Sequence, residues 1–175
     1  MTEEADTRAP SSSRATALVF GVGGGIASTV YGTIMAMSTI AAYGRETHPW
    51  KLDILVMSTA SVLWIAHVYA HALSESISLR RPLRVDSLAP IARRELGIVL
   101  AGVLPSIALL LGAAEILAER SAVWLALGLC LGTLAVEGVR YAQLERVGPT
   151  GTVTAVALNV GLGLCVVALK VALTH

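Results

Sequence analysis

Residues 64–75, with the sequence WIAHVYAHALSE, carry three ionisable side chains inside a run that is otherwise apolar enough to cross a membrane. His67, His71 and Glu75 follow one another at intervals of four residues. Residues four apart in an α-helix are offset by about 40° around the helix axis, so the three side chains lie on one face. Two imidazoles and a carboxylate at this spacing can ligate one metal ion, and histidine exchanges protons near neutral pH.

Three interpretations of this polar face remain open. In the first, the histidines and the carboxylate form interhelical hydrogen bonds that hold a helix bundle together. In the second, the face is a metal or proton site with His67, His71 and Glu75 as metal ligands. In the third, a transmembrane histidine binds haem, although two ligands for one iron are expected from opposite helices. No resident cofactor is assigned, and a divalent metal ion is considered only as a substrate.

The elements that position these residues are expected to be membrane-spanning helices. The chain is 55% hydrophobic and 14% charged, whereas a soluble domain carries about 25% charged residues. In lipid every backbone amide needs an internal partner, which helices of about 20 apolar residues provide. The formal net charge of +1 gives no indication of a nucleic-acid partner. We therefore predict an all-α fold, a polytopic transmembrane helix bundle with five spans in the lipid bilayer, at about residues 17–42, 53–75, 96–117, 122–142 and 151–173.

The chain divides into a tail and one membrane domain. Residues 1–14 are small, polar and rich in serine, so we expect a disordered cytoplasmic tail. Residues 15–175 form the predicted five-span domain. The first apolar run is longer than the core of a signal peptide and is expected to remain as a helix.

The distribution of arginine predicts the orientation. With five spans, the N-terminus and the second and fourth connections share one side, and this side holds most of the basic residues. Basic residues favour the cytoplasmic side, so we expect a cytoplasmic N-terminus and an external C-terminus. Arginine far outnumbers lysine, which is typical of high-GC bacteria and indicates a multi-pass protein of the inner cell membrane. The arginine-rich side carries Arg8, Arg14, Arg80, Arg81, Arg84, Arg93, Arg94, Arg140 and Arg146, and the other side carries Arg45, Lys51, Arg120 and Lys170. A short amphipathic helix is expected in residues 80–94, after Pro90.

Other spans supply second candidates for the same site. Glu137 and Arg140 are three residues apart in the fourth span and are expected to pair locally. If the second and fourth spans face each other, Glu137 would instead complete a set with the two histidines. Asn159 of the fifth span lies in the same half of the bundle. Asp53, Glu95 and Glu115 lie at predicted span ends and are interpreted as boundary charges.

Glycine pairs mark two faces on which another helix can approach closely. Gly21 and Gly25 lie four apart in the first span, and Gly128 and Gly132 lie four apart in the fourth. Such small-residue steps favour close helix packing, either within the chain or in a homodimer.

The layout resembles the vacuolar iron transporter membrane family over most of residues 15–173. The second span has a polar end that runs on past the membrane, ALSESISLRR, the third contains a proline, GVLPSIALLLG, and the last contains glycines, NVGLGLCVVALK. The resemblance implies five spans, dimerisation, iron as cargo, and Glu75 as the counterpart of the polar end of the second span. Family members open with an Asp-Gly step, and many carry a Glu-rich metal-binding insert after the second span, whereas this chain has RATALVFGVGGG and the basic RRPLRVDSLAPIARRE. The chain is also similar to small bacterial integral membrane proteins, a likeness that implies no activity.

The sequence predicts a membrane protein that transports or conducts a cation, a divalent metal or a proton, through a polar cavity in the cytoplasmic half. The alternative is a non-catalytic membrane scaffold or accessory subunit. A Ser/His/Asp order, a HExxH motif and a paired-aspartate motif are all missing from the sequence, so we do not expect an enzyme.

Overall fold

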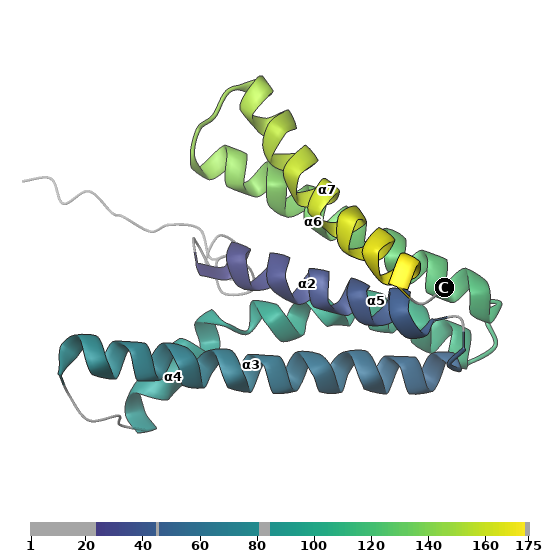
Figure 1. The fold of residues 1–175 in the computed structure, drawn as a ribbon, viewed down its shortest axis with the longest axis horizontal. Helices are drawn as coiled ribbons and strands as arrows, with labels where there is room; N and C mark the ends of the chain where they lie inside the picture. The colour runs from purple at the N-terminus through teal and green to yellow at the C-terminus, as the bar shows by residue number, and fades with distance from the viewer. Residues whose placement is uncertain (1–23, 45, 81–84, 174–175) are drawn as a thin grey trace, which may run out of the picture.

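The computed structural model describes residues 24–44, 46–80 and 85–173, and every regular element in these ranges is a helix. Figure 1 shows them in chain order: α2 (Gly24–Tyr43), α3 (Pro49–Leu79), α4 (Val85–Arg94), α5 (Gly97–Ala113), α6 (Glu119–Leu144) and α7 (Pro149–Leu173). The predicted tail, residues 1–14, and the start of the first predicted span lie outside the described residues.

The helix lengths confirm a polytopic all-α membrane fold. Four helices, α2, α3, α6 and α7, are each long and apolar enough to cross a membrane. Helix α5 has 17 residues, and the number of spans rises from four to five if α5 and the end of α4, which are bent by 40° relative to each other, count as one span. At about 1.5 Å per residue, the 31 residues of α3 exceed the roughly 30 Å of a hydrocarbon core. One end of α3 therefore extends beyond the membrane.

Two predicted boundaries were wrong. The third span was predicted at about 96–117, but α5 ends at Ala113. The helix ends there because the amides of Ile116 and Leu117 both donate to the carbonyl of Leu111, and Glu115 adopts a left-handed φ of 59°. The amphipathic helix was expected after Pro90, but α4 begins at Val85, with Pro90 inside it.

Helix α5 lies at the centre of the bundle. It packs against α3 on one side, α6 on another and α2 on a third, while α7 covers α6 and α2 (Figure 1). Fully buried apolar side chains fill the space between these helices. They include Met37, Ile40, Leu52, Leu109 and Leu134.

Small residues allow α2 to approach the start of α5 backbone to backbone. A Cβ placed on Gly32 would lie 2.5 Å from the carbonyl oxygen of Ile98. A Cβ on Gly97 would lie 2.8 Å from the hydroxyl oxygens of both Ser28 and Thr29. Only glycine fits at such distances, so these two positions fix the beginning of α5 against α2.

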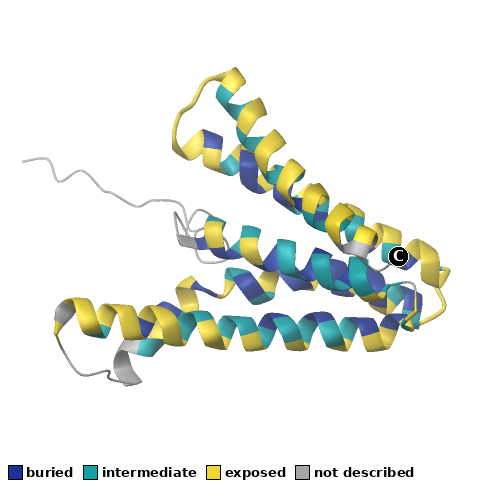
Figure 2. Cartoon of the chain, viewed as in Figure 1, coloured by how far each residue is buried: buried dark blue, intermediate teal, exposed yellow. Residues whose placement is uncertain are grey.

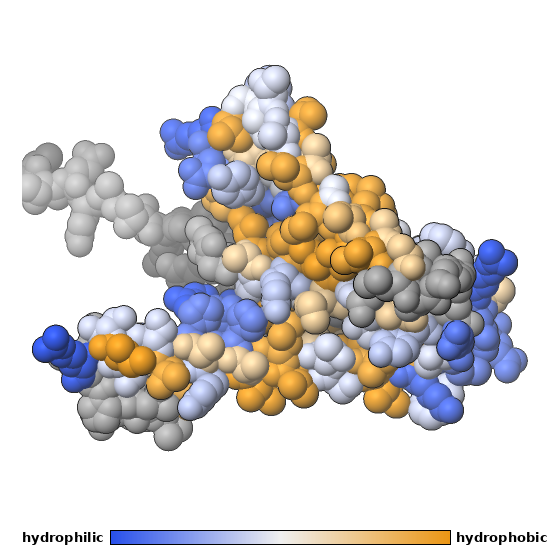
Figure 3. Space-filling view, in the orientation of Figure 1, coloured by the Kyte–Doolittle hydropathy of each residue, from blue (hydrophilic) through white to orange (hydrophobic). Residues whose placement is uncertain are grey.

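The outer surface of the bundle is apolar, as a lipid-facing surface requires. Figure 2 shows long exposed faces on α3, α6 and α7, and Figure 3 shows hydrophobic residues across the middle of the molecule with hydrophilic residues toward its two ends. Ile65, Trp124, Leu158 and Leu169 are among the exposed large side chains. A surface of this kind far exceeds the apolar patches of soluble monomers and matches a membrane environment.

Candidate functional site

The break between α4 and α5 interrupts regular helix inside the bundle. The chain bends at residues 95–96. Val99 N donates to Leu96 O at 3.1 Å, three residues back instead of four, and two further amides at the bend do the same: Leu96 N to Arg93 O at 3.4 Å and Ile98 N to Glu95 O at 3.1 Å. The carbonyls that an α-helix would have paired with these amides therefore need other donors. An unpaired backbone group at membrane depth costs several kcal/mol.

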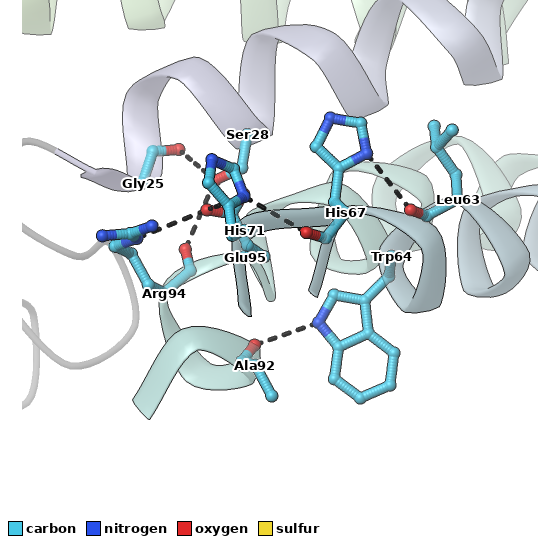
Figure 4. Close-up of polar contacts among 9 residues, drawn as sticks. All are labelled: Gly25, Ser28, Leu63, Trp64, His67, His71, Ala92, Arg94 and Glu95. Atoms are coloured by element: carbon cyan, nitrogen blue, oxygen red, sulfur yellow. Dashed lines mark hydrogen bonds and ion pairs between the residues drawn. The ribbon is translucent and has the colours of Figure 1, made fainter. Parts of the chain in front are cut away.

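Side chains of two neighbouring helices supply those donors (Figure 4). Trp64 of α3 donates its indole N–H to the carbonyl of Ala92 at 3.0 Å. The Ser28 hydroxyl of α2 lies 3.3 Å from the carbonyl of Gly25 in its own helix and 3.4 Å from the carbonyl of Arg94, so its single proton is shared between the two. The break is thus held from both sides and is a built feature of the fold.

A buried carboxylate lies at this break. Glu95 is only 6% exposed, and its Oε1 atom lies 3.5 Å from Nδ1 of His71 and 3.3 Å from Nε of Arg94. One carboxylate oxygen therefore faces an imidazole from α3 and a guanidinium from its own chain neighbour. From the sequence, Glu95 is interpreted as a boundary charge, but in the fold it is buried against α3.

Each histidine ring turns its Nδ1 atom toward a carbonyl oxygen of its own helix. Nδ1 of His71 lies 3.2 Å from the carbonyl oxygen of His67, and Nδ1 of His67 lies 3.2 Å from that of Leu63. A carbonyl oxygen only accepts hydrogen bonds, so these two contacts are hydrogen bonds in the tautomer that carries its proton on Nδ1, which leaves the lone pair of a neutral ring on Nε2. Uptake of a second proton at Nε2 of His71 would place a positive charge directly beside Glu95.

His71 and Glu95 differ in their exposure to solvent. The side chain of His71 is 45% exposed, whereas that of Glu95 is 8% exposed. An imidazole that reaches the surface and contacts a buried carboxylate can pass a proton between the surface and the interior of the bundle.

His67 lies one turn deeper on α3 and is half-buried. Its ring packs against Tyr31 of α2, with 4.9 Å between the ring centroids, and lies 6.2 Å from the ring of His71. The predicted common face of His67 and His71 is therefore present and turned toward α2 and the break.

Glu75 does not join the histidines in this cluster. It is exposed, one turn beyond His71, and makes no ion pair within the described part of the chain. Over residues 24–44, 46–80 and 85–173, no group of three or more His, Cys, Asp and Glu side chains is placed to hold a metal ion. The structure brings His71 together with Glu95, and His67 with Tyr31.

The second candidates lie on the other side of the bundle. Glu137 is 2% exposed and accepts two hydrogen bonds from Nη1 of Arg140, at 2.7 and 2.9 Å, which confirms the predicted local pair. Asn159 of α7 donates to the carbonyl of Leu134 at 3.4 Å. Helix α3 packs mainly on α5, α2 and α4, so Glu137 is not brought to the histidines.

A hollow of about 800 Å³ lies at the opposite end of the bundle. It is bounded by the connection between α2 and α3 and by the start of α6. There His48 Nε2 lies 3.0 Å from Glu119 Oε1, and both side chains are exposed. An exposed ion pair of this kind contributes about 0–1 kcal/mol and is screened by salt, so the buried carboxylate is the stronger candidate.

Glu95 was missed because its partner comes from another helix. Helical periodicity within residues 64–75 pairs His71 with Glu75. Tertiary packing instead pairs His71 with Glu95, 24 positions further along the chain. The sequence contains a signal for the break, since RREL stands directly before Gly97 and the apolar run. Charged residues followed by glycine at the start of a span indicate a point where regular helix is interrupted.

Comparison found no matching family model, no significantly similar curated protein and no significantly similar solved structure. The likeness to iron transporters therefore stays a prediction from sequence motifs.

Proposed function

We propose that this multi-pass membrane protein transports or conducts a cation, and that the cation is a proton handled by His71 and Glu95. One observation carries the proposal: a carboxylate buried at a break in a span contacts a half-exposed imidazole from a neighbouring helix, at 3.5 Å. Ionisable groups inside a membrane are costly and typically mark ion pathways or proton relays.

The surroundings of Glu95 favour a proton over a divalent metal. Its Oε1 atom already faces the guanidinium of Arg94, and a fixed positive charge at 3.3 Å opposes a second cation on the same oxygen. A divalent metal also needs more ligands than one carboxylate and one imidazole. Iron as cargo rests on the sequence resemblance alone.

The proposed orientation puts this pair on the cytoplasmic side. The end of the bundle that carries His71 and Glu95 also carries Arg80, Arg93 and Arg146. Basic residues beside the ends of spans favour the cytoplasmic leaflet. The inner membrane of a bacterial cell is the proposed location.

A non-catalytic scaffold is the second candidate, and specific contacts favour it. Trp64 donates to the carbonyl of Ala92, Ser28 shares its proton between the carbonyls of Gly25 and Arg94, and both histidines bond to their own helix. In that case the contact between His71 and Glu95 only fixes α3 against the break.

Proton flux into liposomes containing the full-length protein separates these functions. A pH-sensitive dye inside the vesicles would report acidification after an outward potassium diffusion potential, in the presence of a metal chelator. We expect faster acidification than in protein-free vesicles, loss of most of that flux in Glu95→Gln, and retention in Glu75→Gln, a matched exposed carboxylate one turn from His71. Each variant is first checked for a single symmetric elution peak.

Two results would reject the proton proposal. Wild-type flux equal to that of empty vesicles would leave the scaffold standing. Wild-type flux in Glu95→Gln would remove Glu95 from the pathway. If Glu95→Gln does not fold, His71→Gln makes the same test at a half-exposed position.

A further inference from the structure

Within the described ranges, two buried side-chain oxygens have no hydrogen-bond partner: Oδ1 of Asp53 on α3 and Oγ of Ser106 on α5. Ser106 is 7% exposed. Other hydroxyls in the spans behave differently, since Thr33 and Thr133 donate to carbonyls one turn back in their own helix at 2.7 and 2.9 Å. Ser106 does not make this usual bond, and its hydroxyl remains available to another partner.

The two oxygens lie on facing sides of α3 and α5. A Cβ on Gly102 would lie 3.2 Å from Sδ of Met57, and a Cβ on Gly112 would lie 3.4 Å from Cγ of Pro49. Helices α3 and α5 run antiparallel. Residues of α3 counted from Met57 toward Pro49 therefore lie opposite residues of α5 counted from Gly102 toward Gly112. The aspartate is one turn from Met57 toward Pro49, and the serine is one turn from Gly102 toward Gly112. The register therefore places the aspartate beside the serine.

The carboxylate of Asp53 has no positive partner in the described part of the chain. Lys51, two residues before it, instead holds its Nζ atom 5.5 Å from the centroid of the Trp50 ring. Asp53 as a whole is only partly buried, but its Oδ1 atom is fully buried, and a carboxylate oxygen buried without a counter-charge is unfavourable in a span. The site therefore favours a ligand that brings a positive charge.

We propose that Asp53 and Ser106 bind a small monovalent cation, with Na⁺ as the ion of fitting charge and ligand preference. No hydrogen bond joins the two oxygens, so both are available to an ion between them. Pro105 has no N–H, so the carbonyl of Ala101, one turn before it, loses its helical donor and would be available as a third oxygen ligand. Irregular backbone that frees carbonyls is a recurring way to coordinate Na⁺ in membranes.

The donor set selects against divalent ions. Ca²⁺ takes six to eight oxygens and Mg²⁺ a strict octahedron, usually with more than one carboxylate or bound waters. A single carboxylate is neutralised by a single charge. The site lies at the end of the bundle opposite His71 and Glu95, and it does not rest on the proton proposal.

Binding of radioactive ²²Na⁺ tests the site in the full-length protein, held in nanodiscs of neutral phosphatidylcholine. N-methyl-D-glucamine chloride keeps the ionic strength constant. We expect saturable Na⁺ binding and a higher thermal unfolding midpoint in NaCl than in the organic salt. Asp53→Asn should abolish both effects, and Ser106→Ala should weaken binding by about tenfold, the equivalent of one lost charge-assisted contact.

Matched controls keep the test specific. Ser58→Ala removes a hydroxyl on the exposed side of α3, where it donates to Leu55 O at 3.1 Å, and should bind Na⁺ as the wild type does. Glu46→Gln removes an exposed acid at the same end of the bundle and should also be neutral. Absence of Na⁺ binding in the wild type would mean that only water bridges the two oxygens, and would overturn the proposal. Undiminished Na⁺ binding in both single variants, Ser106→Ala and Asp53→Asn, would overturn the proposal as well. If Asp53→Asn does not fold, undiminished Na⁺ binding in Ser106→Ala is enough to overturn it.

Discussion

Oε1 of Glu95 lies 3.5 Å from Nδ1 of His71, and this contact joins the long helix α3 to the break that begins α5. The break itself is stabilised by donors from α3 and α2. The charge of Glu95 and the geometry of the break are therefore coupled, because a shift of α3 would move the imidazole and the indole together.

Trp64→Phe should destabilise the protein, because the phenyl ring keeps most of the buried area but leaves the carbonyl of Ala92 without its donor. A buried polar group left unpaired costs about 1–3 kcal/mol. Unfolding in mixed detergent, followed by circular dichroism, would measure the loss. Trp124→Phe is the control, since this indole is exposed on α6. Equal stability of the two variants would remove the hydrogen bond from the account of the break.

Gly32→Ala should disturb the packing of α2 on α5, because the new Cβ would lie 2.5 Å from the carbonyl oxygen of Ile98. Forcing extra volume into a packed interface costs about 1–3 kcal/mol. Gly132→Ala is the matched control, since a Cβ there meets nothing within 4 Å. The thermal unfolding midpoint should fall for Gly32→Ala and stay level or rise for Gly132→Ala. The reverse order would contradict the described approach of the two helices.

The sequence predicts the elements of this fold well because lipid restricts the choices. A run of about 20 apolar residues has to become a helix, and the runs around Met37, Val56, Leu109 and Leu134 did so. Helix ends were harder, because the end of α5 depends on a left-handed Glu115 that hydropathy does not reveal.

The site was only partly predictable. Helical spacing correctly put His67 and His71 on one face, and Glu137 beside Arg140. It could not show that Glu95 approaches His71, because that contact depends on how α4 folds back against α3. The same limit applies to Asp53, which looks like a boundary charge in sequence and has a buried oxygen in the fold.

Gly128→Leu tests the expected homodimer. A Cβ at Gly128 meets nothing within 4 Å of the same chain, so the larger side chain should leave the fold of the monomer intact. If two copies meet through this face of α6, the leucine would separate them. Light scattering in mild detergent should show a dimer for the wild type and a monomer for the variant. A monomeric wild type would end the dimer hypothesis, and a dimeric variant would exclude this face.

Reporter fusions test the orientation. A periplasm-active enzyme fused after His175 should be active, whereas the same enzyme inserted in the connection between α3 and α4 should be inactive, because arginine retains that connection in the cytoplasm. A fluorescent protein that folds only in the cytoplasm should give the reverse pattern. The same result at both positions would contradict the five-span topology.

The most direct test of the central claim is a double-mutant cycle in the liposome proton flux, with His71→Gln, Glu95→Gln and the double variant. If the two side chains form one proton-handling unit, each single change should abolish most of the flux, and the double variant should lose no more than either single variant. Independent structural roles would instead give losses that multiply in the double variant. Wild-type flux in the double variant would contradict the account outright.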